Sequence, residues 1–243
     1  MKLSGNILTY LIQFVILMTV VISLVTGNFF VSISGTIVLF VSFIPYYFER
    51  KTHIIIPWWV TFFIALSLYL HIAGYSMGWY ESGYPYYDKF AHLISSMTVA
   101  MLVFLLVLIL NRYENIRFSR VMVFFSVFLF TLALGSIWEI LEFSIDQVFG
   151  NRLHFNTMLQ HGLDDTMSDL IFNLIGGLIV ASVGTWYLKR VDGSAIVDGF
   201  VQTGKKAYIP GLTHKRRHNP SPGISMEMTC SDNAPTERHE GVE

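Results

Sequence analysis

Residues 90–110, FAHLISSMTVAMLVFLLVLIL, decide the fold class of this chain. A helix rises about 1.5 Å per residue, so about 20 apolar residues cross a hydrocarbon layer about 30 Å thick. His92 is the one ionisable side chain in this stretch. The stretch therefore predicts a transmembrane helix.

Apolar stretches of similar length lie on both sides of it. Backbone groups in lipid must be satisfied within their own segment, and none of the stretches shows the short alternation of a barrel strand. We expect an all-α polytopic membrane protein with six transmembrane helices, over residues 7–26, 29–48, 54–73, 90–110, 121–145 and 170–188.

The composition supports this class and excludes others. Hydrophobic residues make up 53% of the chain and charged residues 14%, against about 25% charged in an average soluble domain. A formal net charge of -1 argues against nucleic acid as a partner. The single cysteine, Cys230, excludes an internal disulfide. The expected partner is the lipid bilayer.

The basic residues of the connecting loops predict the orientation, because lysine and arginine collect on the cytoplasmic side. With the N-terminus inside, the outer side holds only Lys89 and Arg152. The inner side holds Lys2, Arg50, Lys51, Arg112, Arg117, Arg120, Lys189 and Arg190. We therefore expect both termini in the cytoplasm.

The chain divides into two parts by composition. Residues 1–190 form the six-helix transmembrane domain, and residues 191–243, with prolines and scattered charges, are expected to be a flexible cytoplasmic tail. The outer loop over residues 74–87 is rich in tyrosine and tryptophan, which is typical of an aromatic belt at the membrane interface.

Ionisable residues gather at the outer ends of the last three spans, each set spaced for one helical face. The three sets are Asp88 with His92, then Glu139, Glu142 and Asp146, and last Asp165, Asp169 and Asn173. Because the fifth span runs outward and its neighbours run inward, we expect these faces at a common depth. Ionisable groups inside spans are costly and usually mark function.

Several of these residues also have structural interpretations. Thr166 and Asp169 match a capping box, which would place Asp169 in a helix first turn. Asp165 suits a helix N-terminus, and Asp88 could pair with Lys89. Glu139 and Glu142 resist such explanations, because they approach a helix C-terminus and repel each other at a spacing of three.

A carboxylate-rich set with one histidine and an asparagine matches a divalent cation such as Mg²⁺, Mn²⁺ or Zn²⁺. The first hypothesis is a metal-dependent enzyme that acts on a lipid or lipid-linked headgroup at the outer interface. In it His92 is a ligand or general base, and Asn173 orients a ligand or substrate oxygen. The expected metal ligands are Glu139, Glu142, Asp165 and Asp169, with Asp88 and Asp146 as further candidates.

Two other functions use the same residues. In a proton- or cation-coupled transporter the carboxylates would carry the coupling ion, although no internal repeat is evident. In a non-catalytic protein they would form a structural polar cluster that holds three helices together. Gly176, Gly177, Ala181 and Gly184 are expected to allow close helix contact in the sixth span.

Together, these motifs resemble the bacterial YjdF-type inner-membrane family over about residues 45–188. They read Asp88-Lys89-x-x-His92, Trp138-Glu139-x-x-Glu142-Phe143-x-x-Asp146 and Asp165-Thr166-x-x-Asp169-Leu170-x-x-Asn173-x-x-Gly176. The resemblance implies a multi-pass inner-membrane protein of uncharacterised activity. The first motif and Asp169-x-x-x-Asn173-x-x-Gly176 also look like elements of the VanZ-like family, which is linked with glycopeptide-antibiotic tolerance.

Overall fold

The computed structural model describes residues 2–52, 56–80, 86–113, 116–150 and 159–200, and these residues are helical with short connections and no strand. Within these ranges, six helical segments are long and apolar enough to cross a membrane. The helices are α1 (Lys2–Val25), α2 (Phe29–Ser42), α3 (Ile44–Thr52), α4 (Trp58–Ser76), α5 (Tyr87–Tyr113), α6 (Arg120–Ile145), the π-helical turn η1 (Asp146–Gly150), α8 (Leu163–Tyr187) and α9 (Gly193–Phe200). The predicted six-span, all-α class is confirmed.

The second span consists of two helices. Helix α2 ends at Ser42, and α3 carries Pro45 in its first turn. Proline lacks the N–H group that would continue the hydrogen-bond ladder, so the helix breaks just before it. Gln13 of α1 donates a hydrogen bond of 3.1 Å to the Ser42 carbonyl oxygen at this break. Together α2 and α3 form one candidate span, Phe29–Lys51.

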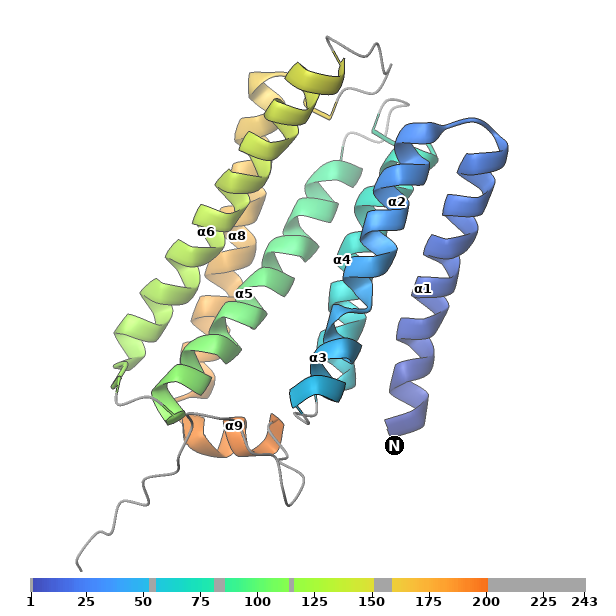
Figure 1. Ribbon diagram of the computed structural model, residues 1–243. Coiled ribbons are helices and arrows are strands. Elements are labelled where there is room, and N and C mark those ends of the chain that lie inside the picture. Colours follow the sequence, from blue (N-terminus) through green and yellow to red (C-terminus); the bar gives the residue numbers. More distant parts are fainter. Residues whose placement is uncertain (1, 53–55, 81–85, 114–115, 151–158, 201–243) are drawn as a thin grey trace, which may run out of the picture. The chain divides into compact units, whose positions relative to one another are not determined.

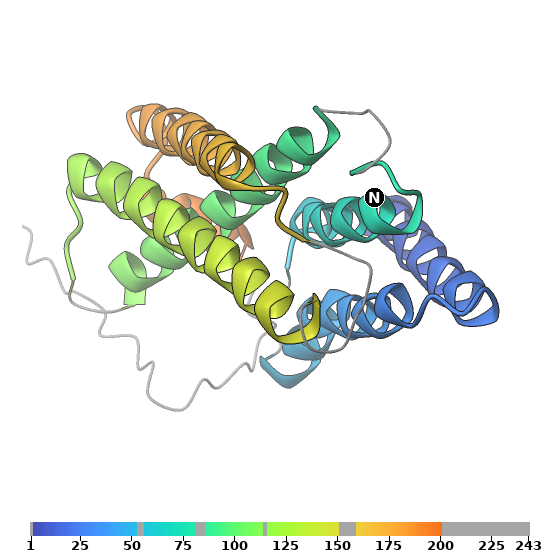
Figure 2. The same ribbon diagram turned by 90° about the horizontal axis from the view of Figure 1, so that it is seen from above.

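The helices pack as two groups that meet at α5. Helices α1, α2 and α4 contact one another, α5 contacts α6 and α8, and α4 packs against α5. Figures 1 and 2 show α6 and α8 on one side of α5 and the group of α1, α2 and α4 on the other. Helix α5 is therefore the central element. We call the end at which α5 begins the upper end, as drawn in Figure 1.

Small residues bring α5, α6 and α8 close together. A side chain on Gly176 would meet the Ser96 hydroxyl and the Leu93 carbonyl oxygen of α5, and one on Gly177 would meet Thr131 of α6. Ala181 is fully buried in an apolar cluster with Val127. The predicted close contact along the sixth span is confirmed, and it fixes the spacing of the site helices.

Two spans begin earlier than the apolar pattern indicates. Helix α8 begins at Leu163 instead of residue 170, and α5 begins at Tyr87 instead of residue 90. The capping-box interpretation of Thr166 and Asp169 is wrong, because Gly162 is the N-cap and Asp169 lies inside the helix. The polar first turns are stabilised by contacts between α5 and α8, which a hydropathy pattern does not contain.

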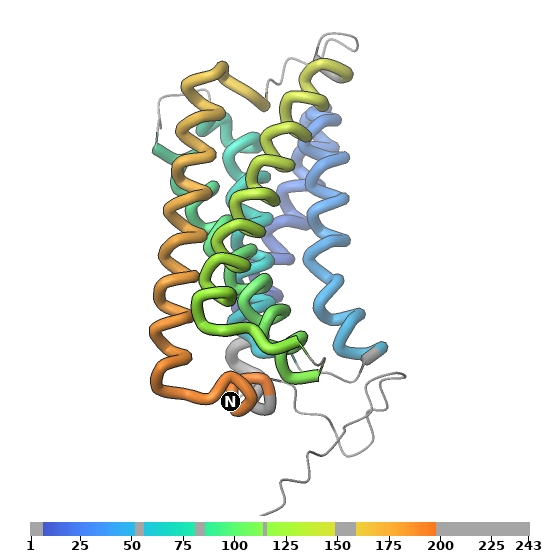
Figure 3. Tube along the Cα trace, turned by 90° about the vertical axis from the view of Figure 1, so that its left-hand side faces the viewer, coloured from blue at the N-terminus to red at the C-terminus, as the bar shows by residue number. Residues whose placement is uncertain are grey.

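A short separate helix, α9, follows the last span. Helix α9 buries Ile196 and Val197 against Leu108 of α5, and Figure 3 shows it turning across the lower end. Helical structure thus extends beyond the predicted domain boundary at 190. The rest of the predicted flexible tail, residues 201–243, lies outside the described residues, and its cytoplasmic location stays a prediction.

Candidate functional site

The upper ends of α5, α6 and α8 bring the predicted polar residues together around Lys89. The Lys89 Nζ atom lies 2.8 Å from Asp88 Oδ2, 2.5 Å from Asp165 Oδ1 and 2.8 Å from Asp169 Oδ1. The Asp169 side chain is 2% exposed and the Lys89 side chain 13%. One ammonium group therefore binds three carboxylates from two helices in a largely buried position, where unpaired charges are costly.

His92 lies one turn below Lys89 and faces carboxylates on both sides of its ring. Its Nε2 atom lies 3.5 Å from Asp88 Oδ1 and 3.8 Å from Asp169 Oδ1. Its Nδ1 atom lies 3.7 Å from Glu139 Oε1. The imidazole is buried and lies between the lysine-bound aspartates and Glu139 of α6.

Glu139 and Glu142 form the α6 side of the site, and both are buried. Trp138 Nε1 donates a hydrogen bond of 2.9 Å to Glu142 Oε1. Glu139 Oε1 has no hydrogen-bond partner among the described residues. With Lys89 engaged by three aspartates, full ionisation of both glutamates would leave uncompensated negative charge in a buried position. These two carboxyl groups therefore need a further cation or protons.

Asp146 has a different role from the other acidic residues. Its Oδ2 atom accepts hydrogen bonds from the backbone N–H groups of Leu159, at 2.9 Å, and Gln160, at 2.8 Å. Gln160 in turn donates to the Glu139 carbonyl oxygen at 3.3 Å. Asp146 thus fixes the segment that leads into α8. Its carboxylate is occupied by backbone donors.

Asn173 lies deeper in α8 than the carboxylates, at the wall of a cavity. It is 4% exposed, its Nδ2 atom has no hydrogen-bond partner among the described residues, and its side chain lies within reach of His92. A Cβ atom on Gly135 of α6 would lie 2.9 Å from Asn173 Nδ2. Glycine at position 135 therefore makes the room that the amide occupies.

The cavity beneath His92 and Asn173 has a volume of about 210 Å³. Side chains of four helices line it, including Ser67 and His71 of α4, Val99 of α5 and Leu134 of α6. Apolar surface predominates in the lining. The site thus combines a polar upper layer with an apolar hollow directly below.

His71 lines the cavity on the α4 side and contacts Tyr80, and the sequence analysis assigned neither residue to the site. His71 Nε2 lies 3.1 Å from Ser95 Oγ, and its Nδ1 lies 3.3 Å from the Tyr80 hydroxyl. Burial raises the pKa of Tyr80 well above its usual range, so the phenol stays protonated. Tyr80 packs so closely over Gly74 that a methyl group there would meet its ring. Tyr80 therefore contacts the site through His71.

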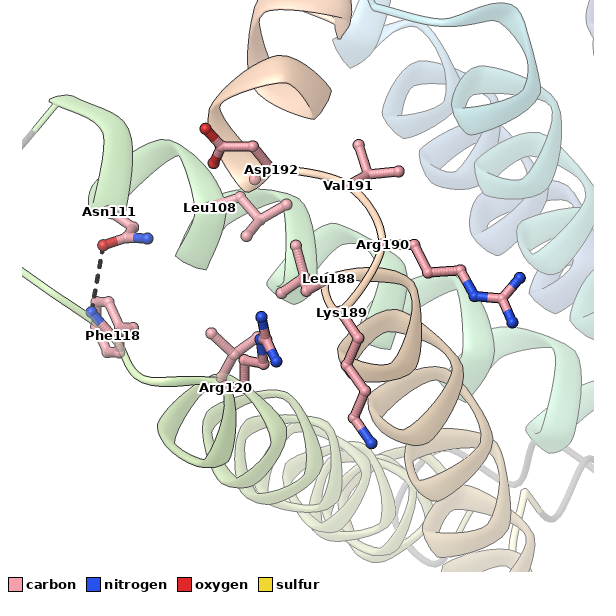
Figure 4. A pocket seen from close by; sticks show the side chains of 11 residues that line it. Leu108, Asn111, Phe118, Arg120, Leu188, Lys189, Arg190, Val191 and Asp192 are labelled. Atoms are coloured by element: carbon pink, nitrogen blue, oxygen red, sulfur yellow. Dashed lines mark hydrogen bonds between the residues drawn. The ribbon is translucent and has the colours of Figure 1, made fainter.

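A second cavity, of about 400 Å³, lies at the lower end between α5, α6 and α8. Three cationic side chains line it, those of Arg120, Lys189 and Arg190. Figure 4 shows these side chains extending in different directions, and Arg190 stacks over Trp186 with 4.4 Å from its guanidinium carbon to the ring centroid. The cations do not converge on one point, so this cavity is a weaker candidate site than the upper one.

Among the described residues, two groups of side chains at the upper end could hold a metal ion. They are Asp88, His92 and Asp169, and His92, Glu139 and Glu142, with ligand atoms within 4.8 Å of one another in each group. Lys89 already binds Asp88 and Asp169 of the first group. In the second group Glu139 keeps an oxygen without a donor. The second group is therefore the better metal-binding candidate.

Comparison with known proteins agrees with this membrane architecture. The chain matches the DUF2238 family, described as predicted membrane proteins, over residues 7–190. It is 30% identical over 165 residues to an uncharacterised protein of Thermotoga maritima, covering 68% of this chain and 81% of the relative. No solved structure matches the chain.

The protein is thus a multi-span membrane protein with a buried polar site at one end. It belongs to the DUF2238 family, which is the YjdF-type family that its motifs resemble. The likeness to the VanZ-like family stays a prediction, because neither match names that family.

Proposed function

We propose that this protein is a metal-dependent enzyme embedded in the membrane, and that it acts on a lipid or lipid-linked headgroup. The observation that carries the proposal is the buried group of His92, Glu139 and Glu142, which lies next to aspartates that already bind Lys89. Two buried carboxylates without a cation of their own are a natural site for a divalent ion.

The structure favours a ligand set that differs in part from the one expected from sequence. Glu139 and Glu142 remain metal ligands in this set. Asp165 and Asp169 instead bind Lys89 and would hold α5 and α8 in position around the metal. The third ligand in this set is His92, which would bind the metal through Nδ1, while its Nε2 faces Asp88 and Asp169. A metal-bound histidine that is oriented by carboxylates on its other nitrogen is a common arrangement.

Three protein ligands leave coordination positions open, as in catalytic metal sites. A cation bound there would polarise a phosphoryl or carbonyl oxygen of the substrate. His92 belongs both to the ligand group and to the cavity wall, and Asn173 lies on that wall. The Asn173 amide can therefore donate a hydrogen bond to an oxygen of a substrate that lies beside the metal.

The position of the site favours a lipid substrate over a water-soluble one. His92 lies about 8 Å below the start of α5, at a rise of about 1.5 Å per residue. That depth is close to the headgroup region of a bilayer whose hydrocarbon core the helix spans. With the predicted orientation, the site would lie at the outer face of a bacterial inner membrane.

The metal content of detergent-purified protein tests the proposal. After loading with Mn²⁺, Zn²⁺ or Mg²⁺ and removal of free metal, the wild type is expected to hold a stoichiometric amount of one of them. Glu139→Gln and His92→Ala should lose it while remaining folded and monodisperse. Asp164→Asn is the matched control, since Asp164 is exposed on the same turn as Asp165. Wild-type protein that binds none of the ions would overturn the proposal.

A structural polar cluster is the second candidate, and one observation favours it. Lys89 joins α5 to α8 through two ion pairs, which is what a helix-bridging cluster requires. Under this alternative, Glu139→Gln lowers the melting temperature and no variant changes bound metal. The same preparations therefore decide between the two functions.

A further inference from the structure

The cavity below the polar site lies between helices that are held apart. Helix α4 packs against α1, α2 and α5, whereas α6 packs against α5 and α8. Ser67 and Leu68 of α4 face Thr131 and Leu134 of α6 across the cavity, with Val99 of α5 at its back. Above them the rings of His71 and Trp138 meet, with their centroids 5.4 Å apart. We call this space the α4–α6 cleft.

The α4–α6 cleft reaches the outer surface of the helices. Leu134 and Trp138 line it and are 45% and 43% exposed, respectively. In a membrane protein, exposed apolar side chains within a span face lipid tails. Leu134 lies in the middle of the span Arg120–Val148. The neighbour available to enter the cleft at this depth is therefore a bilayer lipid.

A buried polar atom at the top of the cleft calls for a ligand with an acceptor. Asn173 Nδ2 is buried and unpartnered within the described part of the chain, and Asn173 lines the cavity. Leaving such a buried donor unpaired is energetically costly. An oxygen of a bound molecule beside His92 would satisfy it.

The size of the cavity, and the order of the groups along it, fit a lipid acyl chain. An apolar cavity of about 150 Å³ holds a benzene-sized molecule, and this one has about 210 Å³. From Trp138 to Thr131 the cavity runs about 10 Å along α6, at about 1.5 Å per residue. Toward the upper end, the apolar hollow is followed by the Asn173 amide donor and then by the carboxylate layer. A glycerolipid has the same order, with an acyl chain, an ester carbonyl and a headgroup.

We propose that the α4–α6 cleft admits one acyl chain of a bilayer glycerolipid sideways, with its ester carbonyl at Asn173 Nδ2 and its headgroup at the His92 layer. This inference rests on the proposed function and deepens it by naming the substrate class and its route of entry. The lipid reaches the site from within the membrane and does not pass through water.

Photolabelling tests this route directly. The protein is reconstituted into phosphatidylethanolamine vesicles that contain phosphatidylglycerol with a diazirine in the upper half of one acyl chain. After illumination, labelled positions are mapped by mass spectrometry. We expect labelling of Leu68 and Leu134 above that of Ile33 and Ile37, which lie exposed on α2. Labelling that is even over all lipid-facing positions would overturn the inference.

Filling the cleft provides the matched comparison. Ser67 is buried in the cleft wall and Ser144 is exposed on α6. Each hydroxyl donates a hydrogen bond to a backbone carbonyl oxygen of its own helix. Ser67→Phe should reduce labelling of Leu134 to the level of α2, and Ser144→Phe should leave it unchanged. Val99→Phe fills the cleft from α5 and replaces Ser67→Phe if that variant does not fold. If neither folds, the wild-type labelling ratio decides.

The outcomes separate this inference from the metal proposal. Ser67 lies outside the ligand group, so Ser67→Phe should retain metal while it loses lipid labelling. Metal binding together with even labelling would overturn only the inference that the cleft admits a lipid. Cleft labelling without metal binding overturns the metalloenzyme and leaves a lipid site.

Discussion

Lys89 Nζ lies 2.8 Å from Asp169 Oδ1, and this ion pair joins α5 to α8 across 80 residues of sequence. The ammonium group is shared with Asp88 and Asp165, so it sets how the two helices face each other. Under the proposed function, it also keeps the aspartates from competing with the glutamates for a metal ion. In the proposed site, Lys89 thus determines that the aspartates form ion pairs and the glutamates bind the metal.

Replacing Lys89 should therefore destabilise the protein more than replacing any exposed lysine. Lys89→Met leaves three carboxylates without their cation, and breaking a buried pair costs about 3–5 kcal/mol. Because Lys89 is not fully buried, we expect the lower part of that range, seen as a lowered melting temperature in detergent. Lys189→Met, at an exposed position, is the control.

Adding Asp165→Asn to Lys89→Met should recover part of the lost stability, since it removes one of the uncompensated charges. A double variant that melts at the temperature expected from adding the two single effects would show that the residues are not coupled. Wild-type melting of Lys89→Met would contradict the role given to the ammonium group.

Asp146 should affect the chain segment before α8 and not the bound metal. Asp146→Ala removes the acceptor of the Leu159 and Gln160 amides. We expect faster hydrogen exchange at these two amides, while metal content stays that of the wild type. Metal loss with unchanged exchange would instead make Asp146 a ligand.

Gly135→Ala should disturb the site by crowding Asn173. The added methyl group would lie 2.9 Å from Nδ2, closer than packed atoms tolerate, and overpacking of this kind costs about 1–3 kcal/mol. The melting temperature should fall. Gly193→Ala is the control, because its methyl group would be in ordinary contact with Leu108 at 3.4 Å. Equal melting of both variants would contradict the close approach of α6 and α8.

The predicted orientation can be tested with a membrane-impermeant thiol reagent on intact cells. Met77 and Ile116 are both exposed and follow α4 and α5 at opposite ends of these helices. In a Cys230→Ser background, Met77→Cys should react and Ile116→Cys should not. The reverse pattern would place the site at the cytoplasmic face and contradict the positive-inside interpretation.

The sequence predicted the six spans because hydropathy and length alone define a helix in lipid. It also predicted that Asp88, His92, Glu139 and Asp169 share one depth, since helix direction and periodicity fix this. Of the three partners of Lys89, it predicted only Asp88. The neighbour Asp88 is evident in sequence, but Asp165 and Asp169 meet the lysine only through the rotation of α5 against α8.

Other features have no signal in a single sequence. Tyr80 lies in a loop whose aromatic content is typical of an interface, yet it turns inward to His71. The α4–α6 cleft arises because α5 separates two helices, which is a property of packing. Asp146 is an exception, because its place at the end of α6, where a carboxylate can accept backbone N–H groups of the following segment, is a signal from which its role could have been inferred.

The position of the bound metal tests the central claim most directly. Crystals of the protein soaked in Mn²⁺ should give an anomalous difference peak between His92 Nδ1, Glu139 and Glu142, with Lys89 still bound to Asp165 and Asp169. A peak among Asp88, Asp165 and Asp169 with Lys89 displaced would contradict this account, as would crystals that show no peak at the upper end.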